Sequence, residues 1–174
     1  MTLPELKTER LRLRAWRPED VEPMAAINGD PRVGEWLGGV IDIEETRARL
    51  QAYAYHWDER GFGIWAVEEC ASGRLVGRTG LMHWDDWTAS THDAEIGWTF
   101  APEVWGRGYA TEAARAALGW AAERPGLQTI VSITRPDNVA SRRVMEKLGL
   151  TYRGETVWRG FDQVWYGIEV DRPG

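Results

Sequence analysis

The segment Trp105 to Thr111, Trp-Gly-Arg-Gly-Tyr-Ala-Thr, contains the residue types that an anion-binding turn requires. Gly106 and Gly108 tolerate backbone angles that other residues avoid, and they place no side chain in the path of a ligand. A helix that begins directly after such a turn presents unpaired N–H groups and the positive end of its dipole. The pattern therefore predicts a seat for a phosphate group, with Arg107 as an added cation. Two glycines are also typical of a βα turn in which they serve geometry alone.

Glu95 is the candidate for acid–base chemistry. It lies on a predicted strand, Ala94 to Phe100, on the face opposite Ala94 and Ile96. A carboxylate with apolar neighbours on its strand is partly desolvated, which raises its pKa toward neutrality and suits a general base. An ordinary strand carboxylate without a catalytic role is the alternative reading, and Asp93 is a lesser candidate for the base.

Other chemistries find less support in the residues. His56, His83 and His92 do not have the spacing of metal ligands, and no Gly-x-Ser-x-Gly nucleophile motif occurs. The glycine turn lacks the lysine of a P-loop and the spacing of a dinucleotide fingerprint, so neither ATP nor NAD is expected. The single cysteine, Cys70, rules out an internal disulfide and a multi-cysteine metal site. We therefore expect no metal.

Two elements must position the glycine turn and Glu95. The predicted strand ends before Pro102, which lacks the N–H that a strand ladder needs. The predicted helix runs from Tyr109 to about Arg124, and Pro125-Gly126 end it. A stripe of small residues on one face of that helix would let it lie close to a sheet. The stripe consists of Ala110, Ala113, Ala114, Ala117 and Ala121.

The rest of the chain predicts further strands and helices, without an internal repeat or a linker. Upstream, the patterns indicate a strand over 8–15, a helix to about Asn28 that Gly29-Asp30-Pro31 ends, a helix from Asp42 or Thr46 to Arg60, and a hairpin of strands 62–68 and 74–83. Downstream they indicate a strand over 129–134, a helix capped by Asp137-Asn138 and ending at Gly149, and a hairpin of strands 150–158 and 161–170. We expect one domain over residues 1–174.

The segment Trp105 to Ala110 resembles the acetyl-CoA motif of the GNAT superfamily of N-acetyltransferases, Gln/Arg-x-x-Gly-x-Gly/Ala after a strand. Trp105 departs from the first position of that motif. The wider text, AEIGW followed by a proline and WGRGYATEA, is similar to the RimJ/RimL branch, in which an aromatic residue at this position is unremarkable. NVASRRVMEKLGL, from Asn138, matches the same branch. The resemblance covers the middle third of the chain and the order of strands elsewhere. It implies an α/β GNAT fold, a mixed and strongly twisted sheet of about seven strands with helices on both faces.

The resemblance also implies roles for individual residues, with acetyl-CoA as cosubstrate. The loop residues Trp105, Gly106, Arg107, Gly108, Tyr109, Ala110 and Thr111 would bind its pyrophosphate. A backbone N–H among Trp98, Thr99 and Phe100 would polarise the thioester carbonyl. Asn138, which can also serve only as a helix cap, would bind the pantetheine arm. Ser141 would hydrogen-bond the leaving thiolate, and Glu95 would be the base. Many family members use a tyrosine as general acid where this chain has Met145, which cannot donate a proton.

Composition limits the partners and the location. The 174 residues carry a net charge of −6, with 43% hydrophobic and 28% charged residues, values that fit one globular domain. Nucleic acid is not expected, because phosphate contacts need clustered cations. No apolar run is long enough for a membrane helix, and the N-terminus has no secretory h-region. The sequence therefore predicts a cytoplasmic protein, either a monomer or a homodimer, without a membrane partner.

The function predicted from these residues is acetyl transfer from acetyl-CoA to a primary amine through a direct ternary complex. Within the RimJ/RimL branch, which acetylates protein N-termini and assorted small amines, the leading acceptor is a protein or peptide N-terminal amine. A polyamine, an amino acid or an aminoglycoside is the alternative acceptor. A non-catalytic module that binds acyl-CoA is the alternative function, and Glu95 beside an intact motif favours the enzyme.

Overall fold

The frame of the protein is one eight-stranded sheet with the strand order β1-β2-β3-β4-β5-β6-β8-β7. The computed structural model of the protein describes residues 3–170. The strands are β1 (Leu6–Lys7), β2 (Leu11–Arg14), β3 (Ile64–Glu69), β4 (Leu75–Met82), β5 (Ala94–Phe100), β6 (Thr129–Thr134), β7 (Thr151–Trp158) and β8 (Phe161–Glu169). The helices are α1 (Val21–Asn28), α2 (Pro31–Leu37), α3 (Ile43–Arg60), α4 (Tyr109–Ala122) and α5 (Val139–Lys147). Short 3-10 turns at Pro18–Asp20 and Pro102–Val104 precede α1 and follow β5.

The sheet is mixed, as predicted, because one neighbouring pair is parallel. β5 and β6 run parallel, whereas every other pair of neighbouring strands in the described chain is antiparallel. The strand predicted over 8–15 is shorter than expected, since Thr8 to Arg10 form a turn in which the Thr8 N–H donates to the Leu11 carbonyl. The short strand β1 before this turn was not predicted, and it raises the count from seven to eight.

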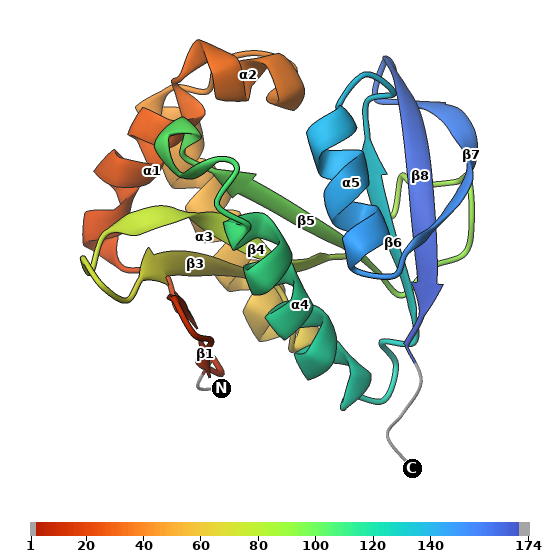
Figure 1. The fold of residues 1–174 in the computed structure, drawn as a ribbon, viewed down its shortest axis with the longest axis horizontal. Coiled ribbons are helices and arrows are strands. Elements are labelled where there is room, and N and C mark those ends of the chain that lie inside the picture. Colours follow the sequence, from red (N-terminus) through yellow and green to blue (C-terminus); the bar gives the residue numbers. More distant parts are fainter. Residues whose placement is uncertain (1–2, 171–174) are drawn as a thin grey trace.

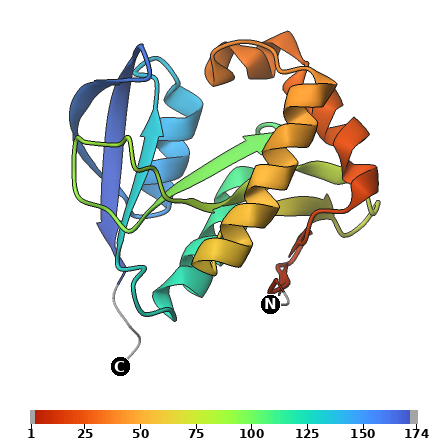
Figure 2. The same cartoon turned by 180° about the vertical axis from the view of Figure 1, so that it is seen from behind.

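Helices cover both faces of the sheet. Figure 1 shows α4 lying across one face, and Figure 2 shows α3 across the other. The predicted alanine stripe faces the sheet, because Ala113, Ala114, Ala117 and Ala121 are fully buried. Ala110, at the start of the stripe, is only half-buried. Small side chains bring the start of α4 close to the strand that precedes it, which places the glycine turn beside β5.

Helix boundaries follow the sequence signals, with one omission. The Asp42 side chain accepts a hydrogen bond from the Glu45 N–H and begins α3, which ends at Gly61 in the left-handed conformation. The helix α2 was not predicted. Asp30 caps α2 by accepting from the Arg32 N–H, and Pro31 occupies its first turn. The same Asp-Pro pair that ends one helix therefore begins another, an arrangement that the fixed φ of proline favours.

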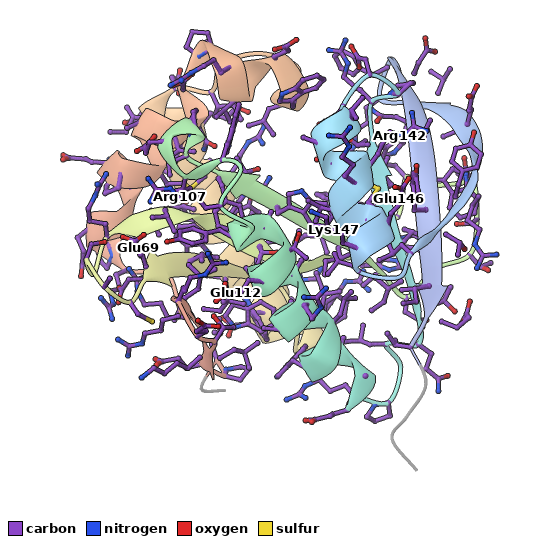
Figure 3. The ribbon with its side chains drawn as sticks, in the orientation of Figure 1. Glu69, Arg107, Glu112, Arg142, Glu146 and Lys147 are labelled. Carbon is purple, nitrogen blue, oxygen red and sulfur yellow. The ribbon has the colours of Figure 1, made fainter. Side chains whose placement is uncertain are left out.

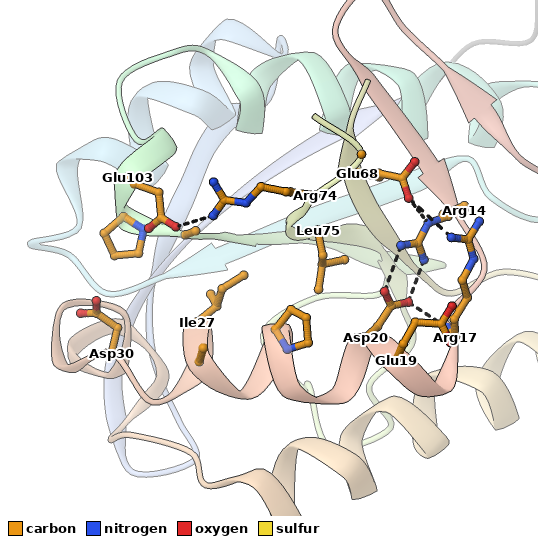
Figure 4. A pocket seen from close by; sticks show the side chains of 15 residues that line it. Arg14, Arg17, Glu19, Asp20, Ile27, Asp30, Glu68, Arg74, Leu75 and Glu103 are labelled. Atoms are coloured by element: carbon orange, nitrogen blue, oxygen red, sulfur yellow. Dashed lines mark hydrogen bonds and ion pairs between the residues drawn. The ribbon is translucent and has the colours of Figure 1, made fainter. Parts of the chain in front are cut away.

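Arg14 differs from its expected exposure. The alternating pattern placed it on a half-exposed strand, yet it is 4% exposed. Its guanidinium donates to both Asp20 oxygens at 2.7 and 2.9 Å and to Glu68 at 2.7 Å, as Figure 4 shows. Burial is tolerated because the charge is paired on two sides. These ion pairs border a cavity of about 410 Å³ whose lining contains neither Glu95 nor the glycine loop.

Candidate active site

The sheet opens where β5 and β6 part. Their parallel pairing is limited to Ala94 with Ile130 and Glu95 with Val131. Beyond that point no residue of β6 pairs with Gly97–Phe100, and Figure 1 shows the two strands diverging. The Ser132 hydroxyl donates to the Ile96 carbonyl at 2.8 Å and closes the fork at its base. On its β6 side, the edge of β5 over Trp98, Thr99 and Phe100 therefore has no strand partner, although the Phe100 carbonyl accepts from the Trp105 indole.

Glu95 lies at the base of this fork, on the last residue pair that joins β5 to β6. Its strand neighbours Ala94 and Ile96 are fully buried on the opposite face, as predicted. The carboxylate lies over Gly97, where a Cβ would approach Oε1 to 3.3 Å. Burial raises the pKa of Glu95 to about 7, although a hydrogen bond from Trp84 and the charges of Arg78 and Arg159 oppose the rise. A carboxylate with this pKa can exchange a proton near neutral pH.

Asp93 has a structural task instead. One of its carboxylate oxygens, Oδ2, accepts hydrogen bonds from the N–H groups of Gln128 and Thr129, both at 2.8 Å. These contacts hold the start of β6 against the start of β5. Because the Asp93 carboxylate is committed to backbone donors, Glu95 is the better placed of the two candidate bases.

An aromatic and cationic cluster of Trp84, Trp158 and Arg159 lies beside Glu95. The Trp84 indole donates to Glu95 Oε2 at 3.3 Å. The Arg159 guanidinium stacks 4.5 Å from the Trp84 ring and 4.2 Å from the Trp158 ring, and Asp86 holds it through two hydrogen bonds of 2.7 and 2.9 Å. Arg159 has a positive φ of 51° in the turn between β7 and β8. The sequence predicts only that Arg159 lies in a turn, since no local signal relates it to β5, the distant strand that carries Glu95.

The loop before α4 has the backbone that was predicted for an anion seat. Gly106 and Gly108 have φ values of 76° and 82°, a region that L side chains rarely adopt. Gly108 is the N-cap of α4 and offers no side chain to its first N–H groups. The Trp105 indole donates to the Phe100 carbonyl at 2.8 Å and ties the loop to the end of β5. The loop therefore adjoins the open edge of β5.

Of the predicted loop residues, Tyr109 uses its side chain elsewhere. Its hydroxyl donates to Glu69 on β3, away from the fork. Arg107 is exposed at the turn, while Ala110 and Thr111 are half-buried in the first turn of α4. Figure 3 shows Glu69, Arg107 and Glu112 around the N-terminal half of this helix. At Tyr109, Ala110 and Thr111 the backbone is thus the group best placed to meet an anion.

Asn138 and Ser141 lie at the start of α5, beside the other arm of the fork. The buried Asn138 caps the helix, since its Oδ1 accepts from the Ser141 N–H at 3.2 Å. The cap uses Oδ1 and leaves the amide Nδ2 for another partner. The Ser141 hydroxyl is half-buried and has no hydrogen-bond partner within residues 3–170. Met145, which the resemblance aligns with a tyrosine, is 1% exposed and belongs to the core.

The remaining candidate groups form no second centre in the part of the chain that the structure describes. His83 and His92 stack at 5.0 Å, and the His83 N–H donates to His56 Nε2 at 3.1 Å. Across residues 3–170, no cluster of three His, Cys, Asp or Glu residues is arranged to hold a metal. No helix in the same range is long and apolar enough to cross a membrane.

Comparison with known proteins places the whole chain in a family. A family model described as an acetyltransferase (GNAT) domain matches residues 10–151. The FsC-acetyl coenzyme A-N(2)-transacetylase of Aspergillus fumigatus is 32% identical over 174 residues, with 95% of this chain and 72% of that protein covered. An acetyltransferase structure from Agrobacterium tumefaciens superposes with a TM-score of 0.83 and 29% identity, covering 97% and 96% of the two chains.

A more distant structure, RimL, described as a ribosomal L7/L12 alpha-N-protein acetyltransferase in complex with coenzyme A, has a TM-score of 0.78 and 21% identity, with 98% and 100% of the chains covered. At that identity it supports the fold alone. The family model, in contrast, matches most of the chain, and this match shows the family. This chain belongs to the GNAT family of acetyltransferases.

Proposed function

We propose that this acetyltransferase moves the acetyl group of acetyl-CoA to the N-terminal amine of a protein or peptide, by direct transfer within a ternary complex. The observation that carries the proposal is the position of Glu95. It is the last residue of β5 that pairs with β6, it adjoins the open edge of β5, and burial raises its pKa to about 7. A base that is half ionised near neutral pH, next to a free strand edge, suits deprotonation of an amine.

The residues present fit acetyl-CoA. Backbone N–H groups of the loop from Trp105 to Thr111 hold the pyrophosphate, with no side chain on Gly106 or Gly108 to obstruct it. The free edge at Trp98–Phe100 holds the pantetheine arm and supplies an N–H to the thioester oxygen. Asn138 adds its amide Nδ2. These contacts align the donor with the amine, and such alignment can contribute several kcal/mol.

The acid–base work falls to two side chains. When bound, acetyl-CoA supplies a thioester whose C–S bond breaks as the C–N bond to the amine forms. Glu95 takes the proton that the amine loses. Ser141 donates a hydrogen bond to the leaving sulfur. A thiolate with a pKa near ~8.5 leaves readily, so this hydrogen bond replaces the tyrosine whose position Met145 occupies.

The charges around Glu95 support an N-terminal amine over a polycation. Arg159 stacks on the Trp84 indole that hydrogen-bonds Glu95. Arg78 lies two residues from Gly80 on β4, which pairs with Gly97 beneath the carboxylate. Both guanidinium charges lower the pKa of Glu95, so each interacts electrostatically with the proposed base. A polyamine or an aminoglycoside would bring several further positive charges to this place, whereas a peptide brings one.

A thiol-release assay over a panel of amines tests the proposal. We expect turnover with peptides that have a free N-terminus and little turnover with spermidine or an aminoglycoside at equal concentration. Peptides with a blocked N-terminus are the matched control, and they should release no thiol above the rate of hydrolysis. Faster turnover of the polycations would instead assign the site to small amines. Binding of acetyl-CoA without turnover of any amine would contradict catalysis.

A further inference from the structure

Arg10 joins the N-terminal turn of the chain to the first turn of α4. Its Nη1 donates to the Arg107 carbonyl at 2.9 Å, and its Nε and Nη2 reach Glu112 Oε2 at 2.7 and 2.6 Å. The same guanidinium lies 4.7 Å from the centre of the Tyr109 ring. One side chain therefore contacts the loop, the first residue of α4 and the carboxylate at the end of its first turn.

Glu112 is a carboxylate on the segment where the pyrophosphate is proposed to bind. It also accepts from the Thr8 hydroxyl at 2.7 Å and from the Arg10 N–H at 2.9 Å. Burial would raise the pKa of Glu112, but the hydrogen bonds from Thr8 and Arg10 outweigh it and keep the pKa below its usual value. Glu112 therefore carries a negative charge. Without a cation in contact, that charge would repel a pyrophosphate on the same helix end.

The contact with the Arg107 carbonyl has a second consequence. The C=O and N–H of a trans peptide point in opposite directions, so a carbonyl turned toward Arg10 turns the Gly108 N–H away from it. That N–H has no acceptor within residues 3–170. A Cβ on Gly108 would have the Arg10 guanidinium as its neighbour, at 3.5 Å. Arg10 thus lies behind the loop, and the free N–H faces the other side.

We propose that Arg10 is a positioning residue for coenzyme binding. Its guanidinium fixes the Arg107–Gly108 peptide so that the Gly108 N–H faces the pyrophosphate, and it neutralises Glu112 from behind. This role rests on the proposed function of the loop. It joins two parts of the chain 102 residues apart, which makes coenzyme affinity depend on a residue that does not touch the coenzyme.

The test compares two acetyl donors, acetyl-CoA and S-acetylpantetheine, which lacks the pyrophosphate. Arg10→Met should weaken the affinity for acetyl-CoA, measured by calorimetry, by about 10- to 100-fold, since charge-assisted hydrogen bonds are lost. The kcat/KM for S-acetylpantetheine should stay within about twofold of the wild type. A merely structural role would lower both values together, and that result would overturn the proposal, as would an unchanged affinity for acetyl-CoA.

Three further variants separate geometry from charge. Glu112→Gln in the Arg10→Met background should recover part of the lost affinity, because no uncompensated carboxylate remains. Arg10→Lys keeps the positive charge without the planar guanidinium and should give an intermediate affinity for acetyl-CoA. If Arg10→Met does not fold, Arg10→Lys takes its place in the comparison of the two acetyl donors. Arg12→Met is the matched control two residues along the chain, since Arg12 pairs with Glu5 and Glu68 and not with α4. Its affinity for acetyl-CoA should equal that of the wild type. If the wild type binds acetyl-CoA but acetylates no amine, the proposed catalysis fails while the affinities still decide the role of Arg10.

Discussion

At the scale of single residues, the environment of Glu95 gives its carboxyl a pKa suited to a general base. Desolvation disfavours the charged carboxylate, and the Trp84 indole and two nearby guanidinium groups favour it. The balance leaves the pKa near 7, so both protonation states are populated at neutral pH. A fully exposed glutamate would be a weaker base by more than two pKa units, and a buried glutamate without these partners would remain protonated.

Replacing Glu95 tests this balance. Glu95→Gln keeps the shape and removes the basicity, and it should lower kcat/KM by ~10²–10⁴-fold. Because the base acts when deprotonated, kcat/KM of the wild type should rise with pH through about 7. The variant should lose this limb while binding acetyl-CoA as before. The measurement is a pH–rate profile of both proteins.

Asp93→Asn is the matched comparison, since Asp93 accepts from two backbone N–H groups at the start of β6. It should lower the free energy of unfolding and keep the pH limb. If Glu95→Gln retained near wild-type kcat/KM across this pH range, Glu95 would not be the base. If Asp93→Asn instead abolished the rise of kcat/KM with pH, Asp93 would be the base.

At the scale of elements, the site depends on the junction of β5, the glycine loop and α4. Gly108 must hold a φ of 82° and also leave the helix N-terminus open. Gly108→Glu strains the backbone and places a negative charge on the proposed phosphate seat, so acetyl-CoA binding should fall below detection by calorimetry. Gly119→Glu is the control on the same helix, where an added Cβ meets nothing within 4 Å. Its affinity should be unchanged, and equal affinity in the Gly108 variant would exclude the loop as the seat.

At the scale of the whole molecule, Arg14 connects β2, β3 and the turn before α1. It is buried, and both Asp20 and Glu68 accept its hydrogen bonds. Arg14→Met would leave the buried Asp20 carboxylate without its cation and would remove the closest partner of Glu68, so the free energy of unfolding should fall by about 3–5 kcal/mol in a denaturant titration. The control is Arg32→Met, whose exposed pair with Asp30 should contribute about 1 kcal/mol or less. Equal effects of the two variants would contradict a central role for Arg14.

Elements whose signals are local could be predicted from the amino-acid sequence. The strand Ala94–Phe100, the start of α4 at Tyr109 and the cap at Asn138 were predicted with these boundaries. The reason is physical, since backbone preferences of glycine, proline and capping residues depend on neighbours within a few positions. The two motifs that resemble the family lie on these same elements, so the family and the fold could be inferred before any contact was known. The unpredicted helix α2 also has a local signal, Asp30-Pro31, but the same two residues are equally typical of the end of the preceding helix.

Tertiary structure alone decided which distant residues meet. Trp84 and Arg159 come together at Glu95, and Arg10 reaches Glu112, through contacts that span long stretches of chain. Strand periodicity assigned Arg14 to a half-exposed face, but its contacts with β3 and with the turn before α1 accompany its burial. Alternation along a strand tells which residues share a face, and only the neighbouring elements decide whether that face is solvated. The pKa of Glu95 also depends on tertiary structure, because it combines burial with the Trp84 hydrogen bond and the charges of Arg78 and Arg159, which the fold brings together.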